Sequence, residues 1–335
     1  VDDTQFTLTT PAEGQNLTAE GYSLSGFRIP GDIASHFDFV TGTASGQLLE
    51  NETTGVDLKL KHQLSRIELK AWGESQSYSL EIAGVRLGGV GVGGDFSFNM
   101  QDDAAGESAA ANWTAVTKGN VDYIFREGDK IVTVHNTPAT DAAYLLRARI
   151  AGEEGAGGKD NSAMVIPGDC AAWAYKDNPE NTPGGDKDAG MYISVLLRIS
   201  DNNSGDQESV FYPSDPIPEK VNVIYLAVDT ENTVKAQLYK QGEKYFTDSG
   251  HTVEYDPVAN SAEVKTFGWA ALPVEARWKP GLVYTYTLNY TAGVGLHDPE
   301  DPNPGTPVIS DGLVVNVEIN KWERTDESAV TVPRK

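Results

Sequence analysis

The side chains best suited to chemistry in this chain are its histidines and carboxylates, and their spacing matches no common catalytic or metal-binding pattern. Histidine-based metal sites usually place a second histidine or a cysteine a few residues away, and no histidine here has such a neighbour. The GxSxG elbow of hydrolases and the Walker A loop are absent, and no spacing marks out a glycosidase pair among the many carboxylates. We therefore predict a non-enzymatic protein with no catalytic residues, no cofactor and no bound metal; the histidines are His36, His62, His135, His251 and His297.

Two segments have the composition of ligand-binding loops but not their context. Residues Gly89–Gly94 fit the GxGxxG pattern, which needs a following helix whose N-terminus faces a pyrophosphate. Phe96 and Phe98 instead indicate another strand, so we interpret the glycines as a turn or bulge. Residues Asp298–Asn303 offer oxygen ligands for calcium, but they lack the spacing and the glycine of an EF-hand loop. A stiff exposed loop is the favoured interpretation, with calcium binding as the alternative.

His62, Cys170 and the tryptophans each favour a packing role. His62 lies on the apolar face of a predicted strand, which favours a core histidine over a ligand or a pH switch. Cys170 is the only cysteine, so no intrachain disulfide forms, and its apolar neighbours favour a small buried side chain over a nucleophile. A sugar-stacking platform is one use for four of the six tryptophans, but packing in the core and at strand ends is commoner; the four are Trp72, Trp269, Trp278 and Trp322.

The overall charge narrows the set of partners. The 335 residues include 26 Lys and Arg against 49 Asp and Glu, which gives a formal net charge of −23. Such a surface repels phosphate backbones and anionic lipid headgroups, so we expect neither nucleic acid nor a membrane surface as a partner. No run approaches the roughly 20 apolar residues of a membrane-spanning helix. The acidic start at Val1-Asp2-Asp3 is not a signal peptide, so we expect an export leader, if there is one, to have been removed.

Alternation of apolar and polar residues predicts many β-strands. Val56, Leu58, Leu60, His62 and Leu64 share one face, and the apolar set then shifts by one residue to the face of Ile67, which predicts a bulge or bend near Ser65. The same pattern predicts strands at Tyr78–Ile82, Val85–Leu87, Tyr123–Phe125, Ile131–Val134, Met191–Ile199, Val221–Val228, Leu282–Tyr290 and Leu313–Ile319.

Short strands separated by Gly- and Pro-rich turns are typical of β-sandwiches, and we predict an all-β fold. The length suggests two domains, and Thr137–Thr140 interrupts the strand pattern near the middle of the chain. We therefore predict two β-sandwich domains, 1–140 and 141–335.

Four runs resemble landmarks of the Bacteroides fimbrillins, a family of major and minor pilins. Val56–Ile67 resembles the family's early strand, an alternating run into His-x-Leu-Ser/Ala-Lys-Ile/Val, with Arg66 in place of the lysine. Met164–Pro167 is similar to the apolar-proline start of a strand in the C-terminal domain, where Gly168 replaces a common glutamine. The other two runs are Trp278–Leu288, similar to Trp-Lys-x-Gly-x-x-Tyr-x-Tyr, and Val315–Trp322, similar to the closing strand.

The resemblance implies two sandwiches of the transthyretin-like, Greek-key type, export as a lipoprotein with its lipid anchor upstream of Val1, and a place at the outer membrane or in a fimbrium. It also implies assembly with other fimbrial subunits by strand exchange, after a protease cuts behind an arginine and releases the N-terminal strand. Arg28 is then the candidate cut site, although Pro30 follows closely. Val330 and Val332 are the candidate donor-strand residues, followed by Pro333, which cannot donate a backbone hydrogen bond.

Two other functions stay open at this stage. A glycan-binding surface lipoprotein that forms no filament would present exposed aromatic faces, and host or bacterial glycans or proteins are the partners considered for such a surface. A calcium-dependent or hydrolytic β-sandwich enzyme would show a metal-dependent melting temperature or turnover. The fimbrial or adhesin-like subunit is the leading prediction.

Overall fold

The computed structural model describes residues 7–9, 23–42, 60–97, 113–148, 160–174, 190–202, 209–214, 217, 222–309 and 312–322. These residues form a β-protein, as predicted. Helical structure among them is confined to two 3-10 turns, η1 (Ile33–Ser35) and η3 (Ala139–Asp141). None of the helical segments within this part of the chain has the length and apolar character needed to cross a membrane.

One large sheet forms the base of the molecule. Its strands follow the order β1-β2-β6-β12-β18-β14-β15-β16-β17, and β7 and β8 pair with β6, β13 with β12, and β21 with β18. Their bounds are β1 Thr7–Thr9, β2 Ser23–Arg28, β6 Tyr78–Ser97, β7 Trp113–Ile124, β8 Val132–Val134, β12 Tyr192–Asp201, β13 Ser209–Tyr212, β14 Val223–Val228, β15 Val234–Gln241, β16 Lys244–Phe246, β17 Glu254–Tyr255, β18 Glu263–Pro273 and β21 Leu296–His297.

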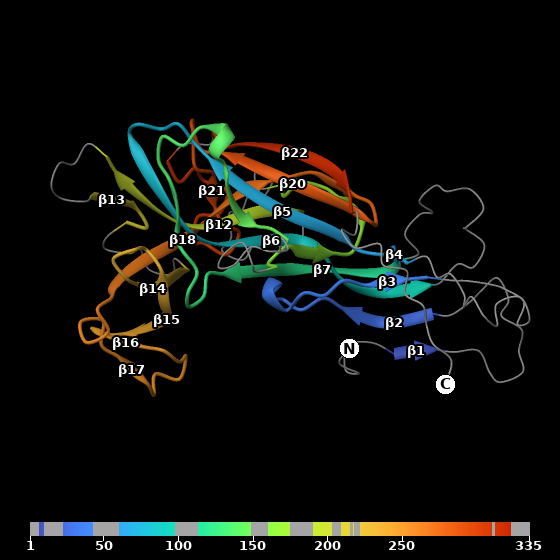
Figure 1. The fold of residues 1–335 in the computed structure, drawn as a ribbon, viewed down its shortest axis with the longest axis horizontal. Coiled ribbons are helices and arrows are strands. Elements are labelled where there is room, and N and C mark those ends of the chain that lie inside the picture. The colour runs from blue at the N-terminus through green and yellow to red at the C-terminus, as the bar shows by residue number, and fades with distance from the viewer. Residues whose placement is uncertain are drawn as a thin grey trace, which may run out of the picture.

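A second sheet of five strands lies over the first, with β5, β20 and β22 stacked above β6, β7 and β12 (Figure 1). Its order is β10-β5-β20-β22, and β9 pairs with β5. Two short pairs, β3 with β4 and β11 with β19, complete the fold. The bounds are β3 Val40–Thr41, β4 Lys61–His62, β5 Ser65–Trp72, β9 Ala143–Leu146, β10 Ala163–Val165, β11 Gly168–Cys170, β19 Ala276–Trp278, β20 Leu282–Asn289 and β22 Val314–Lys321.

The core fills the space between the two sheets, because each strand turns one apolar row inward. On the upper sheet Ile67 and Leu69 are fully buried, and on the lower sheet so are Leu80 and Ile82. The predicted change of face near Ser65 is present, since the chain bends at Leu64 between β4 and β5. The alternation that predicted these strands therefore reports the inward face of a sandwich.

The long strand β6 corrects one prediction. Tyr78–Ile82, Val85–Leu87 and the phenylalanine region, which we predicted as separate strands, form one continuous strand of 20 residues. Its glycines are bulges in that strand, with breaks in register between Leu87 and Val90 opposite β7. Gly89 has φ +66°, and a Cβ there would lie 2.2 Å from the Gly190 carbonyl oxygen, so no other residue fits. The GxGxxG match is thus a feature of strand geometry, as interpreted.

Strands from both sides of residue 140 share both sheets. β6 pairs with β12 along ten residue pairs, and β5 pairs with β9, β10 and, in parallel, with β20. The buried apolar residues of the two halves belong to one main cluster. The division into domains 1–140 and 141–335 stays a prediction.

Candidate assembly site

The acidic loop considered for calcium folds inward and is held by protein groups. Asp298 and Asp301, with 1% and 0% of their surface exposed, are buried despite the expectation of an exposed loop. The Arg86 guanidinium lies 3.4 Å from Asp298 Oδ1 and 3.2 Å from Glu300 Oε2, and the Ser194 hydroxyl donates to Asp298. Burial raises the pKa of Asp298, while Arg86 acts in the opposite direction. This loop is therefore an internal ion-pair network, which the composition of Asp298–Asn303 alone cannot reveal.

The second carboxylate of the loop has its own neighbours. Asp301 Oδ2 lies 3.2 Å from His297 Nδ1 and accepts from the Tyr212 hydroxyl at 3.5 Å. Across the described parts of the chain, no group of three His, Cys, Asp or Glu side chains is arranged to hold a metal ion.

The single cysteine and two of the tryptophans are packed inside, as predicted. Cys170 is 5% exposed, and burial raises the pKa of its thiol. Trp269 and Trp278 are 1% and 3% exposed, so neither offers a ring face to a sugar. Cys170, Trp269 and Trp278 thus serve the core.

Three of the four runs that carry the fimbrillin resemblance meet at one structural junction. The His62 ring stacks on Trp322 with centroids 4.0 Å apart and an interplanar angle of 5°, and the Arg66 guanidinium lies 5.5 Å from the same indole. His62 Nδ1 also lies 2.8 Å from Asp38 Oδ2, so it is tied to a partner outside the core. Gly281 bridges the runs, since its N–H donates to the Leu64 carbonyl and its carbonyl accepts from Trp322. Residues far apart in the chain therefore pack together here. Val56–Lys59 of the first run lie outside the described residues.

Strand β2 (Ser23–Arg28) lies in the lower sheet near the N-terminus, and we call it the plug. It pairs with the last third of β6, matching Leu24 to Phe96 and Arg28 to Gly93, and with the short strand β1 on its other side. A bulge at Gly26, whose N–H donates to Asp95 Oδ1 at 2.8 Å, puts Leu24 and Phe27 on the same inward face. Both side chains are buried, with 2% and 1% of their surface exposed.

The plug closes over a cluster of aromatic side chains that sequence analysis did not identify. Phe27 lies 5.9 Å from Phe37, 5.3 Å from Phe39 and 5.0 Å from Trp113, measured between ring centroids. Phe96 joins the cluster at 4.9 Å from Trp113. In the sequence, three phenylalanines occur between residues 27 and 39, but their spacing matches neither the period of a strand nor that of a helix.

Arg28 is the last residue of the plug and its side chain is exposed. The peptide bond after it is not, because Ile29 is 7% exposed and its N–H donates to the Val92 carbonyl at 2.7 Å. A protease needs an extended and accessible chain, so a cut at this bond requires the end of β2 to separate from β6 first. The candidate donor residues Val330 and Val332 lie outside the described residues.

Strand β22 is an edge strand of the upper sheet. It pairs with β20 along eight residue pairs, and no described strand pairs with its other edge. Val317 and Ile319 are opposite the inward-facing Tyr286 and Tyr284, yet they are 50% and 55% exposed. Sandwich edges with unpaired backbone and apolar side chains are the usual targets of strand addition.

Comparison with known proteins gives similarity in structure only. No protein-family model and no curated protein sequence matches the chain. Among solved structures it is similar to a fimbrial protein from Bacteroides vulgatus, with a TM-score of 0.46, 14% identity, and coverage of 96% of this chain and 73% of that chain.

Two further similar structures are putative cell adhesion proteins. One is from Parabacteroides distasonis, with a TM-score of 0.30, 10% identity, and coverage of 81% of this chain and 55% of that chain. The other is from Bacteroides ovatus, with a TM-score of 0.26, 12% identity, and coverage of 94% and 75%. Five of the similar structures bear fimbrial or putative cell adhesion names.

Proposed function

We propose that this chain is a fimbrial or adhesin-like subunit of the cell surface, anchored at the outer membrane and joined to other subunits by β-strand donation. The observation that carries the proposal is the plug: β2 is a short strand that inserts two apolar side chains, Leu24 and Phe27, into an aromatic cluster and ends at an exposed arginine. The four sequence runs resembling fimbrillins support the same function.

Removal of the plug would create an acceptor groove. Backbone groups of residues 93–97 in β6 would lose their partner strand, and the rings of Phe37, Phe39 and Trp113 would face solvent. Each exposed aromatic side chain costs on the order of 1.5–3 kcal/mol. A strand from another subunit satisfies both needs at once, which gives a large driving force for exchange.

The donor strand in this proposal is the C-terminal segment with Val330 and Val332. Residues two apart on a strand face the same way, as the two inward side chains of β2 do across their bulge. Valines are smaller than the leucine and phenylalanine that they replace, so the donated strand fills the groove less completely than the plug.

The test is digestion with an arginine-specific protease, followed by intact mass and size-exclusion chromatography. We expect a cut after Arg28, at the rate at which the end of β2 separates from β6, and, after it, oligomers whose size rises with protein concentration. Arg28→Gln is the matched control and should be neither cut at this bond nor converted to oligomers.

A second variant separates cutting from donation. With Val330→Asp and Val332→Asp together, we expect the cut after Arg28 to proceed at the normal rate and the product to stay monomeric. The proposal fails if the cut wild-type protein remains a monomer at all concentrations, or if the double variant forms oligomers as readily as the wild type.

A further inference from the structure

A cavity of about 310 Å³ lies where the two sheets part, at the side of the sandwich. One wall comes from the end of β7 and from β8 in the lower sheet, and the other from β9 in the upper sheet. Its size is at the lower end of the range for sites that hold small molecules, and fits one or two sugar rings better than a peptide strand.

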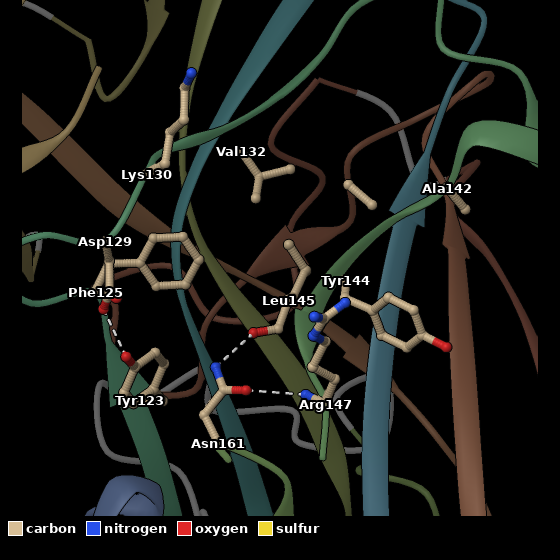
Figure 2. A pocket seen from close by; sticks show the side chains of 11 residues that line it. Tyr123, Phe125, Asp129, Lys130, Val132, Ala142, Tyr144, Leu145, Arg147 and Asn161 are labelled. Atoms are coloured by element: carbon tan, nitrogen blue, oxygen red, sulfur yellow. Dashed lines mark hydrogen bonds between the residues drawn. The ribbon is translucent and has the colours of Figure 1, made fainter. Parts of the chain in front are cut away.

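The floor of the cavity is apolar and buried. Figure 2 shows Phe125 and Leu145 at its centre, and both are buried, with 5% and 2% of their surface exposed. Tyr123, on the same floor, is 4% exposed. Fixed aromatic and aliphatic surface of this kind is what the C–H face of a bound ring needs.

Two polar side chains are held in place over that floor. Asp129 Oδ2 accepts from the Tyr123 hydroxyl at 2.5 Å and from the Arg126 N–H at 2.8 Å. Asn161 accepts from the Arg147 N–H at 3.0 Å and donates to the Leu145 carbonyl at 3.2 Å, as the dashed lines in Figure 2 mark. Their orientation is therefore set before any ligand arrives, which lowers the entropic cost of binding.

The charge at the mouth runs against that of the whole molecule. Arg147 and Lys130 both line the cavity, in a chain with a net charge of −23. The Arg147 guanidinium lies 5.6 Å from the centre of the Tyr144 ring, and Lys70 Nζ lies 4.4 Å from it. Two cations, Arg147 and Lys70, thus lie beside this tyrosine, which is 37% exposed.

We propose that this cavity binds a carboxylated sugar residue, such as a terminal sialic acid or a hexuronic acid, of a surface glycan. The sugar carboxylate pairs with Arg147, its ring packs on the apolar floor beside Tyr144, and its hydroxyl groups reach Asn161 and Asp129. A neutral sugar would make no use of the cations, and a plain anion would make no use of the aromatic floor. The inference is independent of the proposed assembly by strand donation.

The experiment compares ligands that differ only in charge. Saturation-transfer NMR and calorimetry would measure binding of 3′-sialyllactose and of trigalacturonate, each against its own methyl ester. We expect at least one acidic ligand to bind. Its neutral partner should bind with an affinity about tenfold lower or weaker still, the loss typical of one charge-assisted hydrogen bond.

The variants locate the site. Arg147→Gln and Tyr144→Ala should each weaken binding of the acidic sugar about tenfold or more, with the melting temperature near that of the wild type. Arg277→Gln is the matched control, since it removes the same charge from a side chain that is 76% exposed and outside the cavity, and it should bind normally.

Three results would overturn the inference. These are no binding of either acidic sugar, equal binding of acidic and neutral partners, and unchanged binding by both cavity variants. A peptide carboxylate that bound as well as the sugars in the same assay would also overturn it, because the aromatic floor would then have no role.

Discussion

At the scale of single residues, Arg86 is the side chain that holds the acidic loop inside the protein. Its guanidinium reaches Asp298 and Glu300 and lies 4.3 Å from the centre of the Trp269 ring. Removing one partner of a buried ion pair leaves a charge without compensation in a poorly solvated place. Asp298 is therefore stable where it lies only as long as the arginine is present.

We predict that Arg86→Met lowers the free energy of unfolding by about 3–5 kcal/mol, the usual cost of breaking a buried pair from one side. Chemical denaturation followed by tryptophan fluorescence measures it. In the control, Arg277→Met breaks an exposed pair with Glu275 and should change stability by less than about 0.5 kcal/mol. Equal effects of the two variants would show that Arg86 is not the anchor of the loop.

At the scale of elements, His36 ties the segment after β2 to strand β10. Its Nε2 donates to the Pro30 carbonyl at 2.8 Å, and its Nδ1 accepts from the Met164 N–H at 2.9 Å. The bond from Met164 needs an unprotonated Nδ1, and burial lowers the pKa of His36 from 6.5 to about 4. Protonation therefore removes the bond to β10.

The sign of the pH effect follows from this lowered pKa. Between about pH 6.5 and pH 4 the unfolded chain binds a proton that the folded chain does not, so stability falls as the pH falls. We predict a slope approaching about 1.4 kcal/mol per pH unit in the wild type, and a smaller slope in His36→Gln. Unfolding midpoints from pH 7 to pH 5 test it, with the exposed His135→Gln as control; identical slopes for all three proteins would refute the role of His36.

Sequence patterns predicted the strands better than they predicted which strands pair with one another. The alternation of Tyr284, Tyr286 and Leu288 correctly predicts β20, because it reports which side chains face the core. It contains nothing about the partners of β20, which are β22 and, in parallel, β5, more than 200 residues earlier. Phe27 and the cavity at Arg147 were missed for the same reason, since the residues around each come together only through pairing of distant strands.

At the scale of the whole molecule, the net charge of −23 opposes the compact state through self-repulsion. Salt at about 0.15 M screens charges that are more than about 8 Å apart. We predict that the melting temperature rises as sodium chloride increases from about 0.01 to 0.15 M, and equally with choline chloride. Calcium chloride at matched ionic strength should add nothing beyond this, because the carboxylates of residues 298–301 already have protein partners. An extra rise with calcium, reversed by a chelator, would identify a calcium site.

The length of β6 has a mechanical consequence. One end of this strand is paired with β2 and the other with β12, so a single stretch of backbone joins the N-terminal plug region to the centre of the lower sheet. A pull along that direction loads the hydrogen bonds on both sides of β6 in shear, and bonds in shear must break together rather than one after another. Force applied at β2 along the strand direction is therefore distributed over many hydrogen bonds of β6. Force applied across the sheet would instead break the same hydrogen bonds one pair at a time.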